Sequence, residues 1–226
     1  MMFVENAGNI AREAMDSIDK SLSERYASVV NFLSINPNAA SALRGSSAPP
    51  IGSDAYIRRQ AVAFAQSRAA RVPRPPETVP DEMVSVMLIS YFGISQGDAE
   101  RVKREHLLSM GAENLVGDLL ERYLASVMEP QGWIWCSGAM VRAVDFIKPP
   151  SSPGADWRLL QVKNRDNSEN SSSSAIRLGT KIEKWHRTFS KRAGSNWGAF
   201  PDASFRNLLS EDGFKDFVRE YLGKLR

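Results

Sequence analysis

Apolar residues in the first part of the chain recur with the spacing of an α-helix. They return every three or four positions, which gives a helix one apolar face, at Ile10, Ala14, Ile18, Leu22, Tyr26, Val29, Val30 and Leu33. The Asn36-Pro37-Asn38 segment ends this pattern. Helical structure is therefore predicted for roughly the first 35 residues.

Three further helices are predicted before residue 110. The first covers residues 56–70 and is capped by Ser53 or Asp54; the second covers residues 81–91 and begins at Asp81; the third covers residues 96–109. Residues 72–76 include three prolines, which predict a stiff, extended connector.

The pattern changes after Gly111. Residues 112–128 form a strongly amphipathic helix, with Leu115, Leu119 and Tyr123 on one face. Three apolar runs then predict strands, over residues 132–135, 140–147 and 157–163, and we expect the third to be central and buried. From Ile176 the pattern again indicates a helix through Phe189, followed by short helices over residues 205–209 and 214–222.

This order of elements predicts an α/β or α+β protein. We expect a mixed central sheet flanked by helices, preceded by a helical lobe. Residues 1–110 would form the helical N-terminal region, and residues 111–226 the sheet-containing core with C-terminal helices, together one compact unit. With 226 residues, 42% of them hydrophobic, the chain can bury a sizeable core.

Composition argues against several classes of protein. No run of 18 apolar residues exists, so we expect no membrane-spanning helix, and residues 1–6 lack the features of a signal peptide. The single cysteine, Cys136, cannot form an internal disulfide, which fits a reducing cytosol. Two histidines and one cysteine are too few for a standard structural zinc site. We therefore expect a cytoplasmic protein.

Positive charge is concentrated in one stretch of the chain. The net charge is only +3, yet residues 176–192 hold six basic side chains and one acidic one. Such a stretch could contact a phosphate backbone. A solvated helix face explains the same composition equally well.

Two predicted strands bring together residues that suit metal-assisted cleavage of a phosphodiester. Asp145 lies near the end of the second strand, and Gln161 and Lys163 leave the third strand on the same face. A carboxylate can hold Mg²⁺, which prefers oxygen ligands, and a lysine can orient a water molecule or stabilise developing charge. Alone, Asp145 could simply close a turn, and Lys163 could reach solvent.

Gln161 provides an oxygen ligand without charge. The backbone carbonyl of Val162 could supply another oxygen, and Glu121 could supply the missing charge. Glu121 lies four residues after Gly117, which we expect to permit close packing on that side of the helix. A solvent-facing helical glutamate is the alternative interpretation of Glu121.

These residues resemble the PD-(D/E)XK nuclease pattern, in which an aspartate ends one strand and an acid-x-lysine triplet lies on the next. The triplet here is Gln161-Val162-Lys163, and a Gly-x-x-x-Glu helix, Gly117 to Glu121, precedes it. Two longer segments, residues 161–174 and 21–33, resemble the SinI family of type II restriction endonucleases, and this resemblance covers nearly the whole chain.

The resemblance implies a specific activity. Such enzymes cut double-stranded DNA at 5′-GGWCC-3′, where W is A or T, with Mg²⁺, and they act as homodimers in bacteria alongside a cognate DNA methyltransferase. Gln161 departs from the pattern, which usually has an acid at this position. Glu121 or Glu169 could compensate. Two rivals are a non-catalytic DNA-binding relative and a structure-selective repair or junction nuclease; a third, a helical interaction protein, is supported only by the first half of the chain.

The segment after the third strand is rich in side chains that can read bases. Arginine suits guanine in the major groove, whereas acidic side chains suit the cytosine amine. We expect Arg165 to read guanine, with Asn164, Asn167, Glu169 and Arg177 as further candidates. The basic stretch would hold phosphates through Lys181, Lys184, His186, Arg187, Lys191 and Arg192. A disordered serine-rich loop is the alternative interpretation of residues 164–174.

Overall fold

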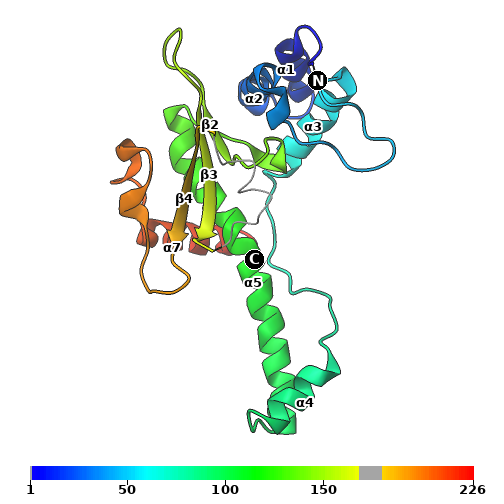
Figure 1. Cartoon of the computed structure of the whole chain (residues 1–226), viewed down its shortest axis with the longest axis vertical. Helices are drawn as coiled ribbons and strands as arrows, with labels where there is room; N and C mark the ends of the chain where they lie inside the picture. The colour runs from blue at the N-terminus through cyan, green and yellow to red at the C-terminus, as the bar shows by residue number, and fades with distance from the viewer. Residues whose placement is uncertain (1, 168–179) are drawn as a thin grey trace.

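A computed structural model describes residues 2–167 and 180–226 of the chain. In this structure the N-terminal helices form one packed group. Helices α1 (Ala7–Asp16), α2 (Ser23–Ile35) and α3 (Asp54–Gln66) lie together at one end of the molecule (Figure 1). The Ser53 hydroxyl accepts a hydrogen bond from the Tyr56 amide (3.2 Å) and caps α3, as the sequence predicts.

The sheet has four strands in the order β1-β2-β3-β4. They span Ile134–Trp135, Phe146–Lys148, Arg158–Arg165 and Ile182–Thr188. The β1–β2 and β2–β3 pairs are antiparallel, and β3–β4 is parallel. The mixed sheet flanked by helices confirms the predicted fold class. Short 3₁₀ turns lie at Lys20–Leu22, Pro37–Ala39, Glu129–Gln131, Ser137–Ala139, Trp197–Ala199 and Ala203–Phe205.

Strand β4 corrects the prediction of a helix through Phe189. Residues 182–188 pair in register with β3, with Val162 opposite Trp185 and Gln161 opposite Lys184. The long strand β3 offers an edge to be paired, and this tertiary pairing outweighs a local pattern that also fits a helix. The second strand, predicted over residues 140–147, is shorter than expected, because a positive φ angle at Ala143 (57°) interrupts the extended backbone.

Helix α5 (Gln96–Met128) is one continuous helix of 33 residues, where the sequence suggests two. The predicted domain boundary at residues 110 and 111 falls within it, and that division remains a prediction. At Gly111 a Cβ atom would lie 2.9 Å from the Arg74 carbonyl oxygen, so the glycine lets the proline-rich connector approach the helix.

Helices α4 and α7 complete the described elements. α4 (Glu82–Ser90) begins after Asp81, whose carboxylate accepts a hydrogen bond from the Met83 amide (2.9 Å). α7 (Glu211–Gly223) confirms the last predicted helix, whereas only the 3₁₀ turn and loop lie over residues 205–209. Within the described ranges, no helix is long and apolar enough to cross a membrane.

Two hydrophobic clusters contact the sheet. One contains α1–α3 together with Ile134 and Ile147. The other contains Leu160 and Val162 of β3 with residues of α5, α7 and β4. Because side chains alternate along a strand, Gln161 and Lys163 leave β3 on the face opposite Leu160 and Val162. The catalytic candidates of β3 are thereby kept out of the α5–α7 core.

Candidate active site

Asp145 is fixed by backbone contacts on both sides. Its amide donates to the Leu160 carbonyl (2.9 Å), and its own carbonyl accepts from the Cys136 amide (2.8 Å). The carboxylate Oδ2 accepts a hydrogen bond from the Val162 amide (2.7 Å). The side chain therefore reaches from the start of β2 onto β3, beside Gln161.

Four predicted catalytic residues line a single pocket. Glu121 from α5, Asp145 before β2, and Gln161 and Lys163 from β3 all face a cavity of about 890 Å³. The arrangement brings together residues up to 42 positions apart in sequence, as the paired-strand interpretation of the sequence expects. Their chemical roles remain predictions.

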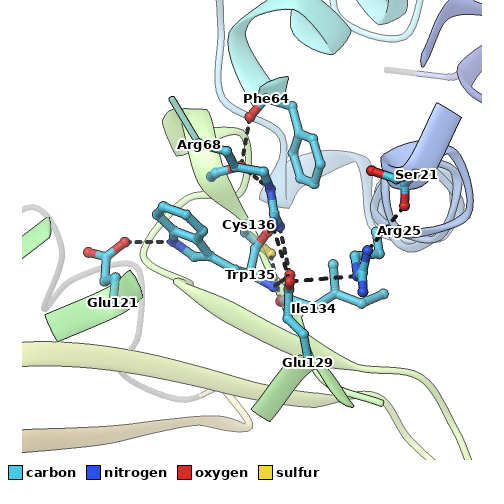
Figure 2. A network of polar contacts seen from close by, with 10 residues as sticks. Ser21, Arg25, Phe64, Arg68, Glu121, Glu129, Ile134, Trp135 and Cys136 are labelled. Carbon is cyan, nitrogen blue, oxygen red and sulfur yellow. Dashed lines mark hydrogen bonds and ion pairs between the residues drawn. The ribbon is translucent and has the colours of Figure 1, made fainter. Parts of the chain in front are cut away.

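Glu121 is held by a tryptophan. Its Oε2 accepts a hydrogen bond from Nε1 of Trp135 on β1 (2.8 Å), as Figure 2 shows. The indole ring of Trp135 lies 5.0 Å from the guanidinium of Arg68 and 5.3 Å from that of Arg122. These contacts fix the indole, and through it the Glu121 carboxylate.

Gly117 does not have the predicted packing role. Apart from its chain neighbours and its own helix backbone, no described atom lies within 4 Å of where its Cβ would stand, and the residue lines the pocket. The absence of a side chain here leaves space in the cavity above Glu121, one helical turn away.

The two acidic side chains of the site resist ionising together. Burial, followed by the charge of Asp145, raises the pKa of Glu121 to about 8. Burial also raises the pKa of Asp145, although the Val162 amide and the Lys163 ammonium act in the opposite direction. Two carboxylates that are hard to ionise together favour a bound cation between them.

Gln161 carries a polar atom that the protein leaves unsatisfied. The side chain is 1% exposed, and its Oε1 accepts no hydrogen bond from any described residue. A buried, unpaired polar atom costs about 1–3 kcal/mol. Such atoms persist where a ligand or ion completes them.

The donor set fits a hard divalent cation. Two carboxylates and a neutral amide oxygen are oxygen ligands, which Mg²⁺ prefers, and Mg²⁺ keeps several of its waters. Among the described residues no group of three or more His, Cys, Asp and Glu side chains is placed to hold a metal. Amide or backbone oxygens would therefore have to complete the coordination.

A network that sequence reasoning missed supports the pocket from the side of α3 (Figure 2). Arg68 donates to both carboxylate oxygens of Glu129 (2.7 and 3.1 Å), to the Trp135 carbonyl (2.8 Å) and to the Ser137 hydroxyl (3.1 Å). Because these partners lie more than 60 residues away from Arg68, no local spacing in the sequence signals the network.

The predicted DNA-contacting residues have different surroundings. Arg187 is tied inside the protein, donating to Asn164 Oδ1 (3.0 Å) and to Glu211 Oε1 (2.5 Å). Lys181 pairs with Asp156 on the surface (2.5 Å). Lys184 lies beside Gln161 in the β3–β4 register, so both side chains share the catalytic face.

The remaining DNA candidates lie near the end of β3 or beyond it. Arg165, the last residue of β3, and Asn167 are exposed. Glu169 and Arg177 fall outside the described residues. The structure therefore brings Lys184 to the catalytic face and leaves the base-reading roles as predictions.

The fold and the pocket define a restriction-endonuclease-like α+β protein: a mixed sheet between helices, with an aspartate and a lysine on adjacent strands beside a helical glutamate. The sequence profile of the SinI restriction endonuclease family matches residues 7–224, and the chain belongs to this family. It is a type II restriction endonuclease, which confirms the predicted class of enzyme.

Two relatives match along almost their entire lengths. The type II restriction enzyme Eco47I of Escherichia coli is 50% identical over 224 residues, covering 99% of this chain and 97% of its own. The type II restriction enzyme SinI of Salmonella infantis is 49% identical over 227 residues, covering 100% of this chain and 98% of its own. Type II restriction enzymes act on DNA, and restriction endonucleases generally need a divalent metal ion.

Proposed function

We propose that this enzyme cuts both strands of duplex DNA at 5′-GGWCC-3′ by Mg²⁺-dependent hydrolysis of the phosphodiester bond. The full-length similarity to restriction enzymes supports the class of reaction. The observation that carries the mechanism is the unsatisfied Gln161 Oε1 beside two carboxylates and Lys163 in one pocket.

Asp145 and Glu121 would hold the ion, with Gln161 Oε1 and the Val162 carbonyl as neutral ligands. Bound Mg²⁺ supplies charge neutralisation at the phosphate and a more acidic water. The chain's own residues prepare the site. The Val162 amide aims Asp145, and the Trp135 indole aims Glu121. The Lys163 ammonium orients the attacking water and offsets charge on the phosphate.

Sequence recognition would lie at the end of β3 and in the segment that follows it. Arg165 is the proposed guanine reader, and Asn164, Asn167, Glu169 and Arg177 are further candidates. Lys184 is the best supported of the proposed phosphate contacts, because it shares the catalytic face with Gln161. Lys181 and Arg187 would first have to exchange their carboxylate partners for phosphate.

The biological setting follows from the same proposal. A two-fold symmetric DNA site suits a homodimer, in which each subunit cuts one strand. A cognate methyltransferase would protect the host's own sites. The enzyme would work in the bacterial cytoplasm, where its DNA substrate enters.

The test is plasmid cleavage by Asp145→Ala and Lys163→Ala. Each substitution should lower the cleavage rate by about 10³-fold or more, while circular dichroism and DNA binding stay close to wild type. Asp212→Ala and Lys215→Ala are matched controls, because these residues form an exposed ion pair on α7. Retained cutting in either pocket variant would overturn the mechanism.

The products distinguish the rivals. Sequencing the cut ends should give one position within GGWCC, and the reaction should stop when Mg²⁺ is chelated. Cleavage of a four-way junction without cleavage of linear duplex would instead indicate a structure-selective nuclease. Binding without any cleavage would indicate a non-catalytic relative.

A further inference from the structure

Residues 79–110 form a projection that we call the arm. It consists of α4 and the first half of α5, which pack against each other and extend away from the sheet and the N-terminal helices (Figure 1). Along α5, Gln96 lies 25 residues from Glu121, a distance of about 38 Å at 1.5 Å per residue. The tip of the arm is therefore far from the catalytic pocket.

The arm exposes an unusual amount of apolar surface. Of the sixteen large hydrophobic side chains that are exposed in the described part of the chain, nine belong to the arm. They are Val79, Met83, Val84, Val86, Met87, Ile89, Tyr91, Phe92 and Leu108. A stretch of 32 residues thus carries more than half of these exposed apolar side chains.

Helix α4 is apolar on more than one side, with six apolar residues among its nine. Val84 and Leu88 line a groove with Val102 and Leu107 of α5, so one side of α4 meets α5. Met83 and Met87, one turn apart on another side, are 59% and 61% exposed. No residue of α4 is buried by the described part of the chain. A helix with apolar side chains on opposite sides normally buries both of those sides.

We propose that the outer face of α4 packs against the arm of a second copy of this chain, as a two-fold symmetric dimer contact. This inference rests in part on the proposed function, because cutting both strands of a symmetric site calls for two active sites. An arm-to-arm contact would join the subunits while leaving each catalytic pocket, at the other end of α5, open to DNA.

The charge of the arm argues for a second copy over other partners. The arm holds five acidic and three basic residues, a net charge of −2, although the whole chain carries +3. A negative, apolar surface repels DNA, and it lacks the basic face of a helix that binds anionic membranes. Both signs of charge are present, so opposite charges can face each other across a two-fold contact.

The remaining surface of the arm suits burial. Five of its six charged side chains on α5 are paired within the helix, Arg101 with Asp98 and Glu105 (3.1 and 3.0 Å) and Lys103 with Glu100 (2.6 Å). Tyr91 and Phe92 are already packed edge to face, 5.0 Å apart. One partner of a standard interface buries about 800 Å², and the eight exposed side chains other than Val84, which include two aromatic rings, can supply such an area.

The first experiment measures mass by sedimentation without DNA. The full chain of 25.1 kDa should sediment with twice that mass. Met83→Glu/Met87→Glu should weaken the dimer by about 100-fold or more, because each copy would place unpaired carboxylates in the contact. Leu208→Glu, at a side chain 56% exposed outside the arm, is the matched control and should stay dimeric. Circular dichroism confirms that each variant is folded.

A monomeric wild type at micromolar concentration, or a folded Met83→Glu/Met87→Glu variant that stays dimeric, would overturn the arm contact. A dimeric protein that does not cut GGWCC would instead remove the proposed function and leave the contact standing.

Crosslinking provides a second measurement that does not depend on destabilising the dimer. Cys136 is the chain's only cysteine and is buried, so an introduced surface thiol is the reactive one. Met83→Cys, Val86→Cys and Met87→Cys should give covalent dimers with a short bismaleimide, and Leu208→Cys should not. Equal crosslinking at all four positions, or crosslinking at Leu208→Cys alone, would contradict the proposal.

Discussion

At the scale of single residues, Trp135 connects the catalytic pocket to the rest of the protein. Its Nε1–H donates to Glu121, and its ring lies against Arg68 and Arg122. Hydrogen-bond partners of this kind orient metal-binding side chains, and losing one typically costs about 10–100-fold in metal affinity or activity. Trp135 is therefore a positioning residue rather than a catalytic one.

We predict that Trp135→Phe raises the Mg²⁺ concentration needed for half-maximal cleavage by about 10-fold or more. Phenylalanine keeps a ring between the arginines and removes only the N–H. Trp133→Phe is the control, since the Trp133 indole faces Asp202 outside the pocket (3.4 Å). Titrating Mg²⁺ in the cleavage assay checks this. Equal effects of both substitutions would mean that Trp135 acts only through packing.

The sequence predicts part of this site and misses the rest for a physical reason. Strand periodicity places Gln161 and Lys163 on one face, and the pairing of adjacent strands brings Asp145 beside them. The unsatisfied oxygen of Gln161 and the bond from Trp135 to Glu121 depend on three-dimensional packing. Neither has a signature in the local spacing of residues.

At the scale of elements, helix α5 shows how a glycine can be required by a neighbour rather than by its own helix. Gly111 and Gly117 lie in the same helix, where glycine costs about 1 kcal/mol relative to alanine. The sequence predicts a break between two helices at Gly111 and close packing against the helix at Gly117. The structure shows an unbroken helix at Gly111, with the connector pressed against it, and open space at Gly117.

The two glycines should respond to alanine with opposite signs. Gly111→Ala should destabilise the protein by about 1–3 kcal/mol, because the new methyl group would lie 2.9 Å from the backbone of Arg74. Gly117→Ala should stabilise it by up to about 1 kcal/mol, since no described atom is close. Urea unfolding of both variants measures this. If both substitutions stabilised the protein, the connector would have to yield easily at Gly111; if both destabilised it, the space at Gly117 would not be free for a methyl group.

The type of an element was predicted correctly where the apolar pattern of the segment matches the face that the segment buries in the fold. The amphipathic helix over residues 112–128 and the apolar strand over residues 157–163 both occur, because each buries the face that its own pattern defines. Strand β4 was predicted wrongly, since its few apolar residues fit either spacing and its pairing with β3 decides.

At the scale of the whole molecule, Arg68 and Glu129 join the N-terminal helices to the catalytic half. Arg68 follows α3 and Glu129 follows α5, and both side chains are nearly buried, at 14% and 12% exposure. Arg25 of α2 reaches the same carboxylate (3.6 Å), so three helices meet at this ion pair (Figure 2). Arg68 also donates a hydrogen bond to the Trp135 carbonyl, which connects this ion pair to the pocket.

Arg68→Met should therefore lower the free energy of unfolding by about 3 kcal/mol, because it leaves Glu129 buried without its main partner. Cleavage should fall as well, since Trp135 loses a support. Arg58→Met is the control on α3: its pair with Asp54 is exposed, and its loss should cost less than about 0.5 kcal/mol. Adding Glu129→Gln to Arg68→Met should restore part of the stability, because the uncompensated charge is then gone. A double variant no more stable than Arg68→Met would mean that the lost stability comes from the packing of Arg68 rather than from the unpaired charge of Glu129.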